Sequence, residues 1–151
     1  MADGTYNSKV YHKQGGDVLV VASGGTIMEE SGGAILGRAT LNTYLADAGT
    51  ASSCYVICPF AGSIVQMQAV SRVANTNTKT VLTAKTGVGG GLITHPAWEI
   101  TTSQAAGVVS STVPTAANVV TAGQVIEILS DGGSATSAQI TDFSITILRT
   151  S

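Results

Sequence analysis

The sequence has 151 residues, of which 44% are hydrophobic and only 11% are charged, and its formal net charge is −2. This length predicts one domain with a buried core, and the low charge, together with 35 Val, Ile and Leu residues, argues against disorder. The net charge disfavours a nucleic-acid binder with a basic face. No apolar run is long enough to span a membrane, and the N-terminus lacks the apolar segment of a secretory signal. We therefore expect no direct nucleic-acid contact and no membrane contact.

Residues 1–48 predict an extended N-terminal β-arm. Ser23-Gly24-Gly25 recurs eight residues later as Ser31-Gly32-Gly33, and each unit is typical of a short strand followed by a Gly-Gly turn. A ribbon of this kind buries few side chains, so we expect it to lie on another surface or to wrap around sister chains. A plain β-meander packed on its own domain is the alternative. Within this part, residues 41–48 predict one helical turn that Gly49 closes.

Residues 49–151 predict a jelly-roll-like β-sandwich, because short strands alternate with turns. The last strand has the clearest period of two: Phe143, Ile145 and Ile147 point to one face, and the polar residues between them point to the other. Asp131-Gly132-Gly133 predicts a hairpin turn. The expected strands span residues 53–58, 63–73, 78–85, 92–101, 107–112, 118–120, 124–130 and 140–148.

Cys54 and Cys58 lie four residues apart in an expected strand. At about 3.3 Å per residue they are roughly 13 Å apart on one face, whereas a disulfide needs Cα atoms within about 7 Å. We therefore expect two reduced, buried thiols, which suits assembly in a cytosol. A metal site is disfavoured, because only His12 and His95 are available to complete one and their spacing fits no zinc motif.

No pattern predicts catalysis or a cofactor. The chain has no Gly-x-Ser-x-Gly motif and only two histidines, and the order of residues around Gly87–Gly91 differs from a phosphate loop. A sugar-binding platform is one alternative use of the few aromatic residues, and plugs in the core are the other. The aromatic residues in question are Tyr44, Tyr55, Phe60, Trp98 and Phe143.

Three segments resemble the head decoration (cement) proteins and related virion proteins of tailed bacteriophages. They are residues 6–35 (YNSKVYHKQGGDVLVVASGGTIMEESGGAI), residues 58–88 (CPFAGSIVQMQAVSRVANTNTKTVLTAKTGV) and residues 114–149, which contain PTAANVVTAGQVIEILSDGG. The shared features are turn and strand patterns, and they identify no catalytic residue.

The resemblance implies a structural virion protein on the outer surface of an icosahedral phage capsid, assembled in the cytoplasm of a bacterial host. It implies that the protein clamps neighbouring major capsid subunits and self-associates as a homodimer or homotrimer. We expect the arm to contact the capsid by adding strands to exposed edges. The expected partner-binding residues of the arm are Tyr6, Val10, Tyr11, Val18, Leu19, Val20, Ile27 and Ile35.

Two other functions stay open. A tail- or fibre-associated phage protein that binds host surface glycan predicts an exposed aromatic cluster that includes Trp98. A β-sandwich enzyme or lectin unrelated to phages predicts a concave pocket with two titratable groups of perturbed pKa.

Overall fold

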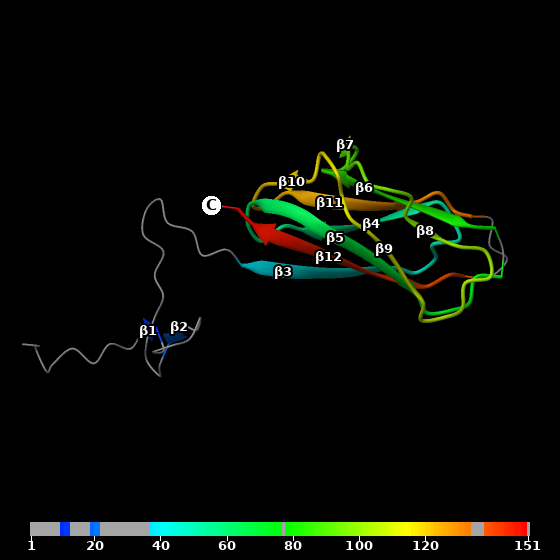
Figure 1. Cartoon of the computed structure of the whole chain (residues 1–151). Helices are drawn as coiled ribbons and strands as arrows, with labels where there is room; N and C mark the ends of the chain where they lie inside the picture. The colour runs from blue at the N-terminus through cyan, green and yellow to red at the C-terminus, as the bar shows by residue number, and fades with distance from the viewer. Residues whose placement is uncertain (1–9, 13–18, 22–36, 77, 134–137, 151) are drawn as a thin grey trace, which may run out of the picture. The chain divides into compact units, whose positions relative to one another are not determined.

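The computed structural model describes residues 10–12, 19–21, 37–76, 78–133 and 138–150, and the described residues form strands and turns without a helix (Figure 1). No helix in this part of the chain is long and apolar enough to cross a membrane. The contacts divide the chain into two compact units, Met1–Ile35 and Leu36–Ser151.

The first unit contains two short antiparallel strands, β1 (Val10–His12) and β2 (Leu19–Val21). Four expected arm contacts, Val10, Tyr11, Leu19 and Val20, lie in these strands, and Tyr11 pairs with Val20. The other four, Tyr6, Val18, Ile27 and Ile35, lie outside the described residues, as do both Ser-Gly-Gly units.

The second unit is an all-β sandwich of two antiparallel sheets. The β3 sheet has the order β10-β5-β12-β3, with β9 also paired to β5, and the β4 sheet has the order β4-β11-β6-β7, with β8 also paired to β6. The strands are β3 (Arg38–Leu45), β4 (Ser52–Ile57), β5 (Gly62–Ser71), β6 (Thr80–Thr86), β7 (Gly91–Leu92), β8 (Glu99–Ile100), β9 (Val109–Thr112), β10 (Val119–Val120), β11 (Val125–Ser130) and β12 (Thr141–Arg149).

This topology is that of a jelly roll. Strands β7 and β8 pair with opposite ends of β6, and β9 and β10 pair with opposite ends of β5, so each pair acts as one interrupted strand. Counted in this way, the sheet orders are first-eighth-third-sixth and second-seventh-fourth-fifth. Two interlocked Greek keys produce this order, and the predicted jelly-roll-like sandwich is confirmed.

The predicted boundary at residue 48 and the predicted helical turn at 41–48 are both wrong. Residues 38–45 form β3, which pairs with β12 over eight positions, from Leu148 opposite Arg38 to Thr141 opposite Leu45. The side chains of β3 alternate between exposed and more buried positions, which is the period of a strand. Gly49 does not close a helix; its amide instead donates to Asp47 Oδ1 at 2.9 Å in the turn after β3.

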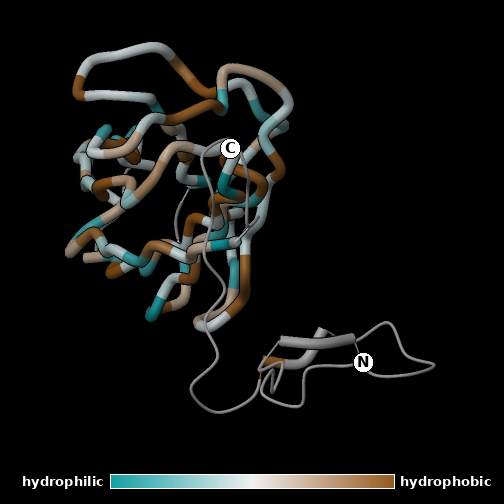
Figure 2. Tube along the Cα trace, turned by 90° about the vertical axis from the view of Figure 1, so that its left-hand side faces the viewer, coloured by the Kyte–Doolittle hydropathy of each residue, from teal (hydrophilic) through white to brown (hydrophobic). Residues whose placement is uncertain are grey.

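The core lies between the sheets. Phe143, Ile145 and Ile147 are buried, as their alternation predicts, and Ile126 and Ile128 of β11 face them from the other sheet. Trp98 is only 1% exposed and stacks edge-on against Phe143 with ring centroids 5.8 Å apart. Hydrophobic and hydrophilic residues alternate along the strands (Figure 2), so each sheet turns one face to the core and one to solvent.

Both cysteines are free and buried, as the strand spacing predicts. Burial raises the pKa of the Cys54 thiol to about 11 and also raises the pKa of Cys58. Both side chains therefore stay neutral and behave as small core residues.

Asp131-Gly132-Gly133 does not form the predicted hairpin turn. It follows β11 in the β4 sheet, whereas the next strand, β12, belongs to the β3 sheet. Asp131 instead extends the contact with β6, because its Oδ1 accepts the amide of Val81 at 2.8 Å. The segment thus starts a connection between the two sheets.

Candidate functional site

Four exposed apolar side chains on the outer face of the β4 sheet form what we call the apolar strip, with Glu127 and Lys85 between its two ends in the register. It consists of Tyr55 and Ile57 on β4, Val88 in the turn between β6 and β7, and Leu92 on β7, whose exposed fractions are 49%, 66%, 69% and 58%. The strip exists because β4 alternates: Cys54 and Val56 point to the core, so Tyr55 and Ile57 point outward. Exposed apolar side chains that gather on one face are typical of binding surfaces.

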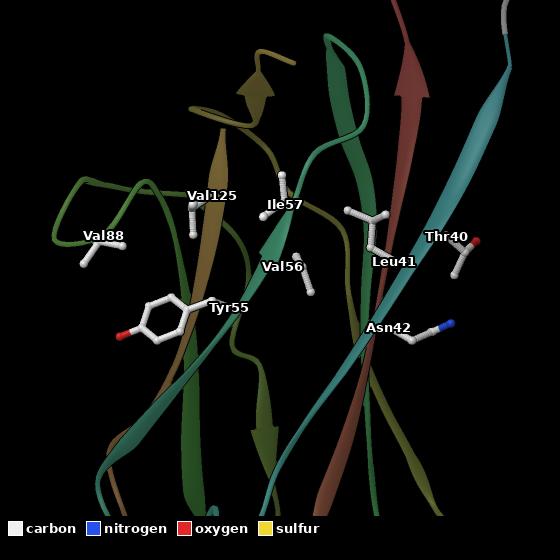
Figure 3. Close-up of a pocket in the computed structure, with 8 residues that line it drawn as sticks. All are labelled: Thr40, Leu41, Asn42, Tyr55, Val56, Ile57, Val88 and Val125. Carbon is white, nitrogen blue, oxygen red and sulfur yellow. The ribbon is translucent and has the colours of Figure 1, made fainter. Parts of the chain in front are cut away.

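The strip adjoins a groove between the free edges of two strands, which we call the edge groove. Strand β3 pairs only with β12, and β4 pairs only with β11, among the described strands. The open groove beside them has a volume of about 650 Å³. Figure 3 shows Leu41 and Val56 pointing into the space between β3 and β4, with Tyr55 and Val88 on the other side of β4. Free strand edges carry unpaired backbone donors and acceptors, which another strand can use.

Glu127 anchors the glycine-rich turn, residues 87–91, that carries Val88. This carboxylate lies on the outer face of β11 and is almost buried. Its Oε2 accepts the amide of Gly89 at 3.0 Å, and its Oε1 accepts the hydroxyl of Tyr55 at 3.4 Å. The Gly89 amide, followed by smaller contributions that include the charge of Lys85, lowers the pKa of Glu127, so the carboxylate is ionised at neutral pH and holds the turn against the sheet.

The glycines of this turn have specific roles. Gly87 and Gly89 have positive φ angles of 94° and 65°, which side chains other than glycine rarely adopt. A Cβ on Gly90 would lie 2.1 Å from the carbonyl oxygen of Thr86. The segment is a tight turn between β6 and β7, in agreement with the prediction that it is no phosphate loop.

The outer face of the β3 sheet is polar. Register aligns Asn42, Ser144, Gln68 and Ser111 across strands β3, β12, β5 and β9, and we call this line the polar row. Beside it, Arg72 Nε and Nη2 each donate to one oxygen of Asp142 at 2.7 Å. This pairing lowers the pKa of Asp142 and raises that of Arg72.

The aromatic residues do not form one platform. Trp98 and Phe143 are core plugs, and Phe60 packs partly buried against the same core. Tyr44 and Tyr55 are exposed, but they lie on the outer faces of opposite sheets. The exposed aromatic cluster including Trp98 that a glycan-binding fibre protein predicts is therefore contradicted.

Titratable groups in the described part of the chain meet in ion pairs, as in Arg72 with Asp142 and Lys79 with Glu99. His95 lies in a turn, where its Nδ1 is 2.8 Å from the Pro96 carbonyl oxygen and its ring contacts Trp98 edge-on. The described residues contain no group of three His, Cys, Asp or Glu side chains that is able to hold a metal ion. Of the groups with shifted pKa, Asp47 serves as a loop anchor, with its carboxylate accepting the amides of Gly49 and Gln139.

Sequence reasoning missed the apolar strip, the edge groove and Glu127. The signal for Tyr55 and Ile57 was present, because they alternate with Cys54 and Val56 in a strand that was predicted. Val88, Leu92 and Glu127 gave no such signal, because strand pairing and the turn place them on this face. Glu127 faces Tyr55 on one side and Lys85 on the other, and Lys85 faces Leu92.

No family model matches the chain, and no curated protein matches its sequence. Among solved structures, the chain is similar to one described as the cyanophage Pam1 capsid asymmetric unit, with 14% sequence identity and a TM-score of 0.49 over 83% of this chain and 92% of that one. A similarity of this strength establishes neither a shared fold nor a shared function.

Proposed function

We propose that this chain is a structural virion protein that decorates the outer surface of a phage icosahedral capsid and stabilises it by clamping neighbouring major capsid subunits. Its partners are then the major capsid protein and further copies of itself, as a homodimer or homotrimer. It assembles in the cytoplasm of the host bacterium, needs no cofactor and performs no turnover.

The observation that carries this proposal is the apolar strip beside the edge groove. The centre of a protein interface is depleted in charged residues and rich in apolar and aromatic ones. The exposed side chains of the strip match that composition: of the two charged residues between Tyr55 and Leu92 in the register, Glu127 is covered by the glycine-rich turn and Lys85 is half-buried. A capsid surface that presents an apolar patch with an extended segment can cover the strip and pair with the edge of β3 or β4.

The jelly-roll topology supports the proposal by analogy alone. Jelly rolls occur in viral capsid proteins and in lectins, and a fold does not by itself define a function. Its physical contribution is rigidity: a sandwich with buried residues from both sheets presents the strip in a fixed shape. A rigid surface binds with a smaller loss of conformational entropy.

The first unit supplies the second contact in this proposal. Its β1–β2 ribbon has three residues in each strand, and an isolated two-stranded hairpin is marginally stable in water. Contact with a capsid surface through Val10, Tyr11, Leu19 and Val20 would stabilise it. Two linked contacts per copy, repeated over a lattice, add to a strong attachment although each one is modest.

The competing functions have less support. The fibre alternative predicted an exposed Trp98, which is buried. The enzyme alternative predicted a pocket with two titratable groups of perturbed pKa. The residues that line the edge groove include no Asp, Glu, His, Lys or Cys. Asp142, which lines a hollow on the β3 sheet, is held in an exposed ion pair with Arg72, and this pairing accounts for the shifted pKa of both groups.

The test is reconstitution on phage heads that lack this protein. Full-length protein should bind in a fixed number of copies per head and raise the temperature at which heads release DNA. Ile57→Asp, which places a charge in the strip, should weaken binding by at least about tenfold. Thr146→Asp, on the outer face of the other sheet, is the matched control and should bind normally.

The arm is tested separately. Deletion of residues 2–33 should leave a folded sandwich by circular dichroism but lower the affinity for heads. If the truncated protein binds as tightly as the full chain, the arm has no role in attachment. If neither the full chain nor Ile57→Asp binds heads at all, the proposed function is wrong.

A further inference from the structure

The outer face of the β3 sheet combines a polar row with the exposed side chains of Tyr44 and Val109. Its central polar row contains two amides and two hydroxyls, from Asn42, Gln68, Ser144 and Ser111. Within the described residues, these four side chains form no hydrogen bond with another protein group. Neighbouring strands are about 4.8 Å apart, so the row offers donors and acceptors at regular, closely spaced positions.

A shallow hollow lies over this row. It has a volume of about 310 Å³ and is lined by Asn42, Gln68 and Ser144, by the carboxylate of Asp142 and by the apolar side chains of Val70 and Val109. This volume is at the lower end of the range for small-ligand sites. Two valines in a floor of amides and hydroxyls give the hollow both an apolar and a hydrogen-bonding character.

An aromatic ring and a fixed ion pair border the row. Tyr44 lies on β3 directly opposite Asp142 of β12 and is 61% exposed. The two bonds from Arg72 fix the Asp142 carboxylate, and each of its oxygens keeps a lone pair that can accept a further hydrogen bond. The Tyr44 ring therefore stands next to an oriented acceptor.

We propose that this face binds a neutral oligosaccharide, with Tyr44 stacking on a sugar ring and Asn42, Gln68 and Ser144 hydrogen-bonding to its hydroxyls. Amide groups donate and accept at once, which matches sugar hydroxyls, and an aromatic face covers the apolar C–H side of a ring.

Other occupants fit this face less well. A phosphate or nucleic acid needs free cationic groups, but Arg72 is paired with Asp142, and Arg38 lies four residues before Asn42 on β3. Protein interfaces are depleted in serine at their centres and enriched in aromatic residues, methionine and arginine, whereas the centre of this face is a row of serine and amide side chains.

The site lies on the sheet opposite the apolar strip, so it is independent of capsid attachment. A copy held to a capsid through the β4 sheet would leave the β3 sheet available to a host-surface glycan. Failure of one proposal leaves the other standing, because the two use different residues and different assays.

The test uses the full chain on an array of neutral, sialylated and phosphorylated glycans, followed by calorimetric titration with the neutral oligosaccharides that bind. Tyr44→Ala should weaken binding about tenfold and Gln68→Ala several-fold. Tyr55→Ala is the matched control, since it removes an exposed tyrosine from the edge strand of the opposite sheet, and it should change affinity less than about twofold. Thermal denaturation of each variant verifies that it is folded.

Three outcomes overturn the proposal. They are binding to no neutral glycan at millimolar concentration, binding restricted to charged glycans, and equal losses for Tyr44→Ala and Tyr55→Ala. Selective loss in the Tyr44 and Gln68 variants supports it.

Discussion

The two outer faces of the sandwich rest on one core but carry different chemistry. On the β4 sheet, outward positions hold Tyr55, Ile57 and Leu92, and a carboxylate is buried beneath a turn. On the β3 sheet, outward positions hold a row of hydroxyl and amide side chains beside a second row of Tyr44, Val70 and Val109, with one exposed ion pair. The inward residues of both sheets are equally apolar, so the fold requires neither composition. Under the two proposals, the apolar strip binds the capsid and the polar row binds a glycan.

The largest expected effect reaches both faces through the core. Phe143→Ala removes a buried ring that contacts Trp98 and should lower the free energy of unfolding by about 3–5 kcal/mol. In this variant, binding at both faces should fall only in proportion to the fraction of unfolded protein. Urea denaturation measures that fraction. A loss under about 1 kcal/mol would mean that the two sheets do not share this core.

A smaller effect follows from the thiols on the inner side of β4. In the folded chain the pKa of Cys54 is about 11, above its ordinary value of 9.0. The unfolded chain therefore loses its proton first as pH rises, so stability is complete below pH 9 and declines between pH 9 and 11. By pH 10, titration of Cys54 should have lowered the free energy of unfolding by about 1 kcal/mol.

The measurement is urea denaturation across this pH range in the wild type and in Cys54→Ala. The variant should show a shallower decline, because tyrosine and lysine titrate equally in both proteins. Identical slopes would contradict burial of this thiol. A disulfide-forming reagent should likewise react slowly with the folded chain and rapidly in urea.

The smallest expected effect is confined to one face. Glu127→Ala removes the acceptor of the Gly89 amide and of the Tyr55 hydroxyl. Hydrogen exchange of Gly89 should accelerate roughly tenfold, since the turn opens more often, and attachment to phage heads should weaken. Asp142→Asn changes the carboxylate of the opposite face and should leave Gly89 unaffected. Equal acceleration in both variants would show that the faces are coupled.

Local pattern predicted most of the sandwich. Each predicted strand after residue 48 overlaps an observed one, and Phe143, Ile145 and Ile147 are buried as the period of two requires. Residues 92–101 were predicted as one strand but form two short ones, β7 and β8. Strand β3 was missed because a glycine after a short polar run is a helix-ending signal. The pairing of β3 with β12, which makes it a strand, joins segments about a hundred residues apart.

The candidate sites were much less predictable than the fold. The resemblance directed attention to arm residues, of which four lie in the described β1–β2 ribbon and four lie outside the described residues. The apolar strip, the edge groove and the polar row all combine strands that are distant in the chain. Tyr44 and Tyr55 are eleven residues apart in sequence, but they lie on opposite faces of the sandwich because the chain changes sheets between β3 and β4.

By itself, the sequence determined that this protein is an all-β sandwich with low charge, two buried thiols and a last strand that turns Phe143, Ile145 and Ile147 inward. These properties follow from composition and from the period of two, which act within a few residues. Only the tertiary structure decided which strands are edges, which outward side chains become neighbours and which carboxylate is covered. Those features depend on pairing between remote strands, and a local pattern carries no information about the partner across a sheet.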